Sequence, residues 1–155
     1  MAHAFSKRSQ RLAVATAIGA AVVWRLAAFP FFGVVPNGML VAMLLVAFFV
    51  RDPLLFAWGA AGVLALSVYV PFFQMEYLLL VALGLAGFLF ARAFVFERKL
   101  GLFIGATLVA QAVWWAGIGY GANIVGIPFV LEFLYNAIVA SALFFIAVWL
   151  EETFS

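Results

Sequence analysis

Residues 36–73 read PNGMLVAMLLVAFFVRDPLLFAWGAAGVLALSVYVPFF, and this stretch decides the fold class. It contains two apolar runs, residues 36–50 and 54–73, separated by Arg51, Asp52 and Pro53. A helix that crosses the roughly 30 Å hydrocarbon core of a bilayer needs about 20 mostly apolar residues. The second run meets this length. The first is short for a full crossing unless Pro36 opens the helix and Arg51 reaches back to the interface, and its alternative is a re-entrant segment.

Four further apolar runs of similar length flank this stretch. The chain of 155 residues is 70% hydrophobic and 9% charged, with a mean hydropathy of +1.27, whereas soluble domains are about half apolar and a quarter charged. We therefore expect an all-α, polytopic membrane protein, with residues 1–155 forming one integral membrane domain. In it, six transmembrane helices form a compact bundle, and they cover residues 12–32, 36–50, 54–73, 77–96, 100–120 and 129–150.

The positive charges predict how the helices cross the membrane. Cytoplasmic connections of membrane proteins are enriched in Lys and Arg. If all six segments cross, every one of the eight Lys and Arg residues except Arg25 falls on the same side, and the opposite connections contain Glu76. Tyr69, Tyr77 and Tyr120 then fall at outer helix ends, where aromatic side chains prefer to lie. We expect a multi-pass protein of the bacterial inner membrane with both termini in the cytoplasm.

The composition also excludes several classes of function. The chain has no cysteine and a single histidine, His3, so a thiol nucleophile, a disulfide framework and a histidine-based metal site are not available. The net charge of +2 forms no basic face, which speaks against a nucleic-acid partner. No phosphate-binding glycine loop or paired-carboxylate motif is present. We expect no enzymatic activity and no cofactor, with membrane lipid as the surrounding partner.

Arg25 lies well along the first predicted helix, where an ionised side chain costs several kcal/mol unless it pairs or reaches water. We predict that it pairs with Glu132, near the outer start of the sixth predicted helix, and so ties the first and last helices together. Glu76 in an outer connection is the other candidate partner. A structural ion pair is favoured over a ligand-binding role.

Two predicted helices carry polar residues four apart, which places them on one helix face. The sixth helix has Glu132 and Asn136, and the fifth has Thr107 and Gln111. Hydrogen bonds between helices are the favoured interpretation. The alternative is a polar cavity for a small ligand on the outer side, formed by a larger set of residues. This set comprises Asn37, Gln74, Glu76, Asn123, Glu132 and Asn136.

Small residues at helical spacing predict places where helices approach each other closely, because helix contacts in lipid depend on backbone proximity. Gly101 and Gly105 form such a pair in the fifth predicted helix. The first predicted helix has a longer stripe of the same kind. It consists of Ala13, Ala17 and Ala21.

Two stretches resemble the rod shape-determining protein MreD family, small six-helix proteins of the bacterial inner membrane. They are FFGVVPNGMLVAMLLVAFFVRDPLLFAWGAAGVLAL, residues 31–66, and FVLEFLYNAIVASALFFIAVWLEE, residues 129–152. The family often has an acidic residue late in its third helix, where residues 66–69 have none. The resemblance implies a non-catalytic scaffold of the cell-wall elongation machinery that takes part in cell-shape regulation. It would bind the MreC protein and act with the actin-like MreB filament and the peptidoglycan synthases.

Transport is the alternative class. The chain is distantly similar to the substrate-binding S-components of energy-coupling factor transporters, which are six-helix proteins with an alanine docking motif in their first helix. Ala13, Ala17 and Ala21 match that description, and the outer polar residues could line a vitamin pocket. The outer connections, however, are short and poor in ligand-binding side chains. An accessory subunit of another membrane complex is a third possibility.

Overall fold

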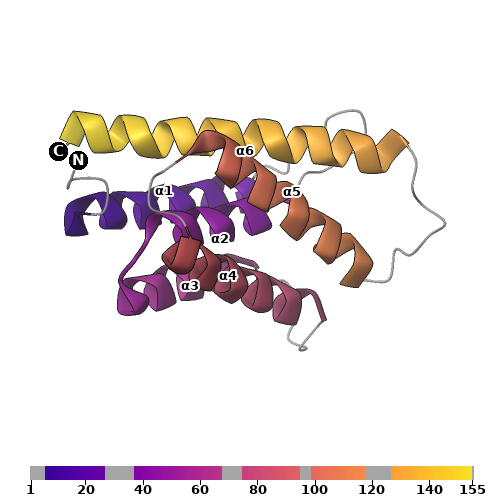
Figure 1. Ribbon diagram of the computed structural model, residues 1–155, viewed down its shortest axis with the longest axis horizontal. Coiled ribbons are helices and arrows are strands. Elements are labelled where there is room, and N and C mark those ends of the chain that lie inside the picture. Colours follow the sequence, from indigo (N-terminus) through magenta and orange to yellow (C-terminus); the bar gives the residue numbers. More distant parts are fainter. Residues whose placement is uncertain (1–5, 27–36, 68–74, 95–98, 118–126, 155) are drawn as a thin grey trace.

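The computed structural model of the protein describes residues 6–26, 37–67, 75–94, 99–117 and 127–154. These residues form six α-helices and no strand, as Figure 1 shows. The helices are α1 (Lys7–Leu26), α2 (Gly38–Phe49), α3 (Pro53–Ser67), α4 (Met75–Phe94), α5 (Leu100–Gly117) and α6 (Ile127–Phe154). The prediction of an all-helical chain with six helices is therefore confirmed.

Within the described residues, three helices are long and apolar enough to cross a membrane, which indicates a membrane protein. They are α4, α5 and the part of α6 from Phe129 to Phe154. The helices α2 and α3 are apolar but shorter, and α1 carries several basic residues near its start. That all six helices cross the bilayer stays a prediction.

The short helix α2 lies at the centre of the bundle and contacts each of the other five helices (Figure 1). Eleven of its twelve residues are buried. A helix of this length spans about 18 Å, well below the thickness of the hydrocarbon core. A helix that is apolar on all sides is typical of a protein interior. The segment that is shortest in the sequence is thus the innermost element of the fold.

Local capping explains where three helices begin. Asn37 caps α2, since its side-chain oxygen accepts a hydrogen bond from the backbone N–H of Leu40 at 3.1 Å. Asp52 does the same for α3 through the N–H of Leu54 at 2.9 Å. The hydroxyl of Ser6 accepts from the N–H of Ser9 at 3.1 Å, and α1 begins at Lys7. The start expected at residue 12 rested on hydropathy alone and missed this polar first turn.

Aromatic side chains fill the core between α2, α5 and α6. Phe49 of α2 meets Phe144 of α6 edge-on, with ring centroids 5.4 Å apart, and meets Phe103 of α5 at 6.3 Å. On the other side of the bundle, Phe56 of α3 stacks on Phe88 of α4 at 4.3 Å. Edge-to-face and offset-stacked pairs of this kind add to the free energy gained from burial. They fix how the outer helices sit around α2.

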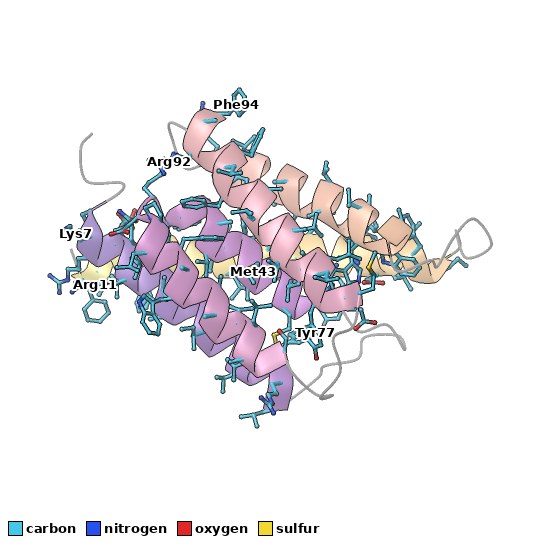
Figure 2. All side chains as sticks on the ribbon, turned by 90° about the horizontal axis from the view of Figure 1, so that it is seen from below. Lys7, Arg11, Met43, Tyr77, Arg92 and Phe94 are labelled. Carbon is cyan, nitrogen blue, oxygen red and sulfur yellow. The ribbon has the colours of Figure 1, made fainter. Side chains whose placement is uncertain are left out.

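Most of the described basic residues gather at one end of the bundle, and Arg25 in the last turn of α1 is the exception. The start of α1 and the end of α6 lie at the same end in Figure 1, and Figure 2 shows Lys7, Arg11 and Arg92 toward one end and Tyr77 toward the other. Arg51 belongs to the same end, because its guanidinium donates to the carbonyl of Ala91. The alternating charges of the sequence predict such a shared end, and that this end faces the cytoplasm stays a prediction. Tyr69, Tyr120 and Arg98 lie outside the described residues.

Gly59 gives a test of the packing between α2 and α3. A methyl group on Gly59 would come within 2.8 Å of Cγ1 of Val46, a β-branched side chain with little freedom to move. We expect Gly59→Ala to lower the free energy of unfolding by about 1–3 kcal/mol, measured as a lower thermal midpoint in detergent. Gly19→Ala is the matched control because nothing lies within 4 Å of its added methyl group. Equal midpoints for the two variants would contradict this packing.

Candidate functional site

Three helices bring amide and carboxylate side chains together inside the apolar bundle. Asn136 of α6 and Gln111 of α5 are both 0% exposed, and Glu132 lies half-buried one helical turn before Asn136. The fourth member is Asn37, the residue that caps α2. We call these four residues, Asn37, Gln111, Glu132 and Asn136, the polar cluster.

Hydrogen bonds within the polar cluster join α2, α5 and α6. The Nε2 atom of Gln111 donates to Oε1 of Glu132, and the side chain of Trp115 donates a second hydrogen bond to the same carboxylate. The backbone N–H of Asn37 donates to Oδ1 of Asn136 at 2.9 Å. The structure thus brings together Gln111 and Glu132, two of the four residues that the sequence places on polar stripes of the fifth and sixth helices.

Each buried amide of the cluster also has one atom without a partner. Among the described residues, neither Oε1 of Gln111 nor Nδ2 of Asn136 makes a hydrogen bond. A buried polar atom left in this state costs about 1–3 kcal/mol. One atom is an acceptor and the other a donor, so each would pair with the complementary group of a ligand that reached it. The sequence predicts the polar residues but gives no sign of which atoms remain unpaired.

Arg25 does not join Glu132 in the structure, which corrects the predicted ion pair. The hydrogen bonds of Glu132 come from α5, whereas Arg25 lies exposed in the last turn of α1. The described helix α1 runs from Lys7 to Leu26, and Arg25 lies in its last turn instead of well inside it. There the helix dipole favours a cation and a long side chain can reach the interface.

Two other polar residues singled out in the sequence, Thr107 and Glu76, lie outside the polar cluster and have local roles in their own helices. Thr107 is buried, but its hydroxyl donates to the carbonyl of Phe103 in its own helix at 2.9 Å, so this bond does not link α5 to α6. Glu76 is exposed in the first turn of α4, where an acidic side chain is favoured by the helix dipole. The predicted outer residues Gln74 and Asn123 lie outside the described residues.

The two predicted stripes of small residues have different surroundings. Ala13, Ala17 and Ala21 are at most 1% exposed, so this stripe packs inside the bundle and is not accessible to a docking protein. Gly101 and Gly105 have no atom within 4 Å of an added Cβ, so they do not mark a close helix contact as predicted. Glycine spacing identifies a face that permits close approach, but not whether a neighbour occupies that face.

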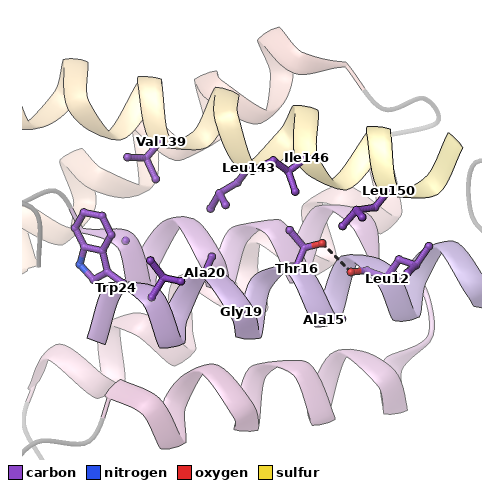
Figure 3. Close-up of a pocket in the computed structure, with 12 residues that line it drawn as sticks. Leu12, Ala15, Thr16, Gly19, Ala20, Trp24, Val139, Leu143, Ile146 and Leu150 are labelled. Carbon is purple, nitrogen blue, oxygen red and sulfur yellow. Dashed lines mark hydrogen bonds between the residues drawn. The ribbon is translucent and has the colours of Figure 1, made fainter. Parts of the chain in front are cut away.

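An apolar groove runs between α1 and α6, which lie antiparallel (Figures 1 and 3). Its volume is about 500 Å³. Ala15, Gly19 and Ala20 of α1 face branched side chains of α6, and Thr16 is the polar side chain in the wall. The Thr16 hydroxyl donates to the carbonyl of Leu12 in its own helix at 2.9 Å. We call this feature the α1–α6 groove, and it offers a partner a surface with no charge.

No metal site is apparent in the described part of the chain, since no three His, Asp or Glu residues group there in a way that could hold an ion. Comparison with protein-family models, with characterised proteins and with solved structures found no match to this chain. The polar cluster and the α1–α6 groove, as described above, form the candidate site.

The partner of Glu132 can be tested by double-mutant cycles. We expect Gln111→Ala and Glu132→Ala to be coupled by about 0.5–3 kcal/mol, because the two side chains share a hydrogen bond. Arg25→Ala and Glu132→Ala should be additive within about 0.5 kcal/mol. Unfolding by SDS in mixed micelles measures both cycles. Strong coupling to Arg25 with additivity for Gln111 would contradict the structure.

Asn136 and Thr107 form a matched pair of fully buried polar residues. Asn136→Ala removes the acceptor of the Asn37 N–H, and we expect a loss of about 1–3 kcal/mol in the free energy of unfolding. Thr107→Val should cost less than about 1 kcal/mol, because the carbonyl that loses the hydroxyl remains in the helical ladder. The same SDS titration compares the two, and equal losses would show that Asn136 does not anchor α2.

Proposed function

We propose that this chain is a non-catalytic scaffold subunit of the bacterial cell-wall elongation machinery, similar to MreD. In this proposal six helices cross the inner membrane, and both ends of the chain lie in the cytoplasm. The scaffold binds a partner through a surface that faces the lipid.

The charge distribution supports the orientation. Lys7, Arg11, Arg51 and Arg92 lie at one end of the bundle, and cytoplasmic ends of membrane proteins are enriched in such residues. Tyr77 lies toward the other end, where its hydroxyl donates to the carbonyl of Ser67 at 2.8 Å. An interfacial position suits a tyrosine whose ring is in an apolar environment and whose hydroxyl is bonded.

The observation that carries the proposal is the α1–α6 groove. Helix association in lipid depends on close backbone approach, and small residues make such approach possible. Gly19 has no atom within 4 Å of an added Cβ, and Ala15 and Ala20 flank it in the groove. The occupant we propose is a transmembrane helix of an MreC-like protein.

The charges beside this groove suit a protein partner. Leu12 and Leu150 line the same end of the groove. Beyond Leu12 toward the start of α1 come basic residues such as Arg8 and Arg11, and beyond Leu150 come Glu151 and Glu152. A juxtamembrane segment with charges of both signs can find partners in such a mixed set, whereas a single anion meets attraction and repulsion together.

A second candidate function is small-molecule binding, as in an S-component-like transporter subunit. The unpartnered Oε1 of Gln111 and Nδ2 of Asn136 favour it, because they present an acceptor and a donor in the protein interior. Burial of Ala13, Ala17 and Ala21 disfavours it, because the stripe that would dock the transporter motor is inside the bundle. The scaffold is therefore the better supported function.

Purification from native membranes in gentle detergent tests the proposal. We expect wall-synthesis membrane proteins to accompany the wild-type chain. Gly19→Leu should reduce their recovery roughly 5- to 150-fold, since overpacking of about 1–3 kcal/mol weakens binding by that factor. Gly105→Leu is the matched control, because it changes another exposed glycine away from the α1–α6 groove. Quantitative mass spectrometry of the purified fractions gives the readout.

Other outcomes separate the candidate functions. A bound vitamin together with ATPase modules would replace the scaffold by the transporter subunit. Proteins of an unrelated membrane complex would identify an accessory subunit instead. Equal recovery with Gly19→Leu and wild type would remove the α1–α6 groove as the docking surface.

A further inference from the structure

A second apolar groove lies between α4 and α5 and has a volume of about 530 Å³. Its walls are formed by small residues, including Gly87 of α4 and both Gly101 and Gly105 of α5, and Leu44 and Phe48 of α2 line it deeper in the bundle. No charged side chain lines it. We call it the α4–α5 groove. It is open because nothing lies within 4 Å of an added Cβ at Gly101 or Gly105.

One end of the α4–α5 groove meets a group of cations. Phe90 and Gly101 both line the groove, and Arg92 and Lys99 lie about half a helical turn farther toward the same end of the bundle, beyond the groove walls. Both side chains are exposed, and Figure 2 shows Arg92 projecting at the end of α4. Arg51 lies close to Arg92, because its Nη1 atom donates to the carbonyl of Ala91, the residue before Arg92.

The electrostatics of this group favour a bound anion. Burial and the neighbouring positive charge of Arg92 both lower the pKa of Arg51 from its ordinary value. The two guanidinium groups are therefore close enough to repel each other, and a negative charge between them would offset that repulsion. Asp52 is nearby in sequence, but its carboxylate accepts hydrogen bonds from the N–H groups of Leu54 and Leu55 at the start of α3.

We propose that the α4–α5 groove and its basic end form a binding site for an anionic phospholipid. The headgroup phosphate contacts Arg92 and Lys99, with Arg51 behind them, and one acyl chain lies against Gly87, Gly101 and Gly105. From residue 101 to residue 113 the groove follows α5 for about 18 Å. One leaflet of the hydrocarbon core is about 15 Å thick, so the length suits an acyl chain.

The chemistry of the two parts matches this occupant. Basic pockets between membrane helices at the cytoplasmic side recognise anionic headgroups, and guanidinium groups bind phosphate oxygens in a bidentate manner. The end of the α1–α6 groove differs, since Glu151 and Glu152 follow its wall residue Leu150. A lipid anion is therefore favoured at the α4–α5 groove, where the flanking charges Arg92 and Lys99 are both positive. This inference does not depend on the proposed scaffold function.

Native mass spectrometry of the detergent-purified chain, titrated with phosphatidylglycerol or phosphatidylcholine, tests the site. We expect wild type to retain phosphatidylglycerol preferentially. Arg92→Gln with Lys99→Gln should weaken that binding roughly 30-fold, because each basic residue near an anionic headgroup contributes about fivefold. Lys7→Gln with Arg11→Gln is the matched control, which removes two charges from the same end of the bundle but away from the groove.

The groove itself is tested separately by Gly105→Leu, which fills it without altering charge. We expect this variant to lose phosphatidylglycerol, and Gly19→Leu in the α1–α6 groove to keep it. Equal retention of both lipids by wild type would overturn the site by showing no preference for an anionic headgroup. Equal loss of phosphatidylglycerol from both double charge variants would overturn it by showing general attraction to the basic surface. A wild-type dimer that Gly105→Leu dissociates, with no lipid bound, would assign the groove to a second copy of the chain.

Discussion

The fold depends on satisfying the backbone ends of a helix that is buried in an apolar interior. A twelve-residue α2 spans about 18 Å, and the first N–H and last C=O groups of any helix need partners from outside it. Away from water an unpaired backbone group costs several kcal/mol. Asn136 of α6 accepts from the N–H of Asn37 at the start of α2, and beyond the end of α2 the side-chain oxygen of Gln10 of α1 accepts from the N–H groups of Arg51 and Asp52, in the turn into α3, at 2.8 and 3.0 Å. Both side chains are therefore buried because α2 is central.

Packing around α2 also accounts for the two open grooves. Small residues let the outer helices approach closely, as at Gly59 against Val46 and at Gly84, where an added Cβ would lie 2.7 Å from Met43. The α1–α6 and α4–α5 grooves lie where two outer helices do not fill the space between them. Their walls are alike, so the flanking charges distinguish them. Glu151 and Glu152 follow a wall of the α1–α6 groove, whereas Arg92 and Lys99 flank one end of the α4–α5 groove. For this reason we assign a protein partner to the first groove and a lipid anion to the second.

Hydropathy predicted the number and order of the helices because bilayer thickness sets a length that apolar runs must meet. Spacing of four residues predicted that Gln111 and Glu132 would face a neighbouring helix, and they face each other. Which helix is central was not predictable, because side chains that face lipid and side chains that face the core are equally apolar. The same ambiguity misplaced Gly101 and Gly105. Arg25 was misassigned because hydropathy alone placed it well inside the first helix, whereas it lies in the last turn of α1.

In the polar cluster, some side-chain atoms hold helices together and others remain without a hydrogen bond and could bind a ligand. In Asn136, Oδ1 anchors α2, and the amide nitrogen of the same group is buried with it as a consequence. In Gln111, Nε2 donates a hydrogen bond to Glu132, a residue that makes no hydrogen bond to the ends of α2. The carboxylate of Glu132 also accepts a hydrogen bond from the side chain of Trp115, so it would keep one hydrogen-bond partner in a Gln111→Leu variant. The need to anchor α2 therefore explains why a polar side chain is buried at Asn136, but it does not explain the one at Gln111. Substitution of Gln111 can thus separate a structural role from a ligand-binding role.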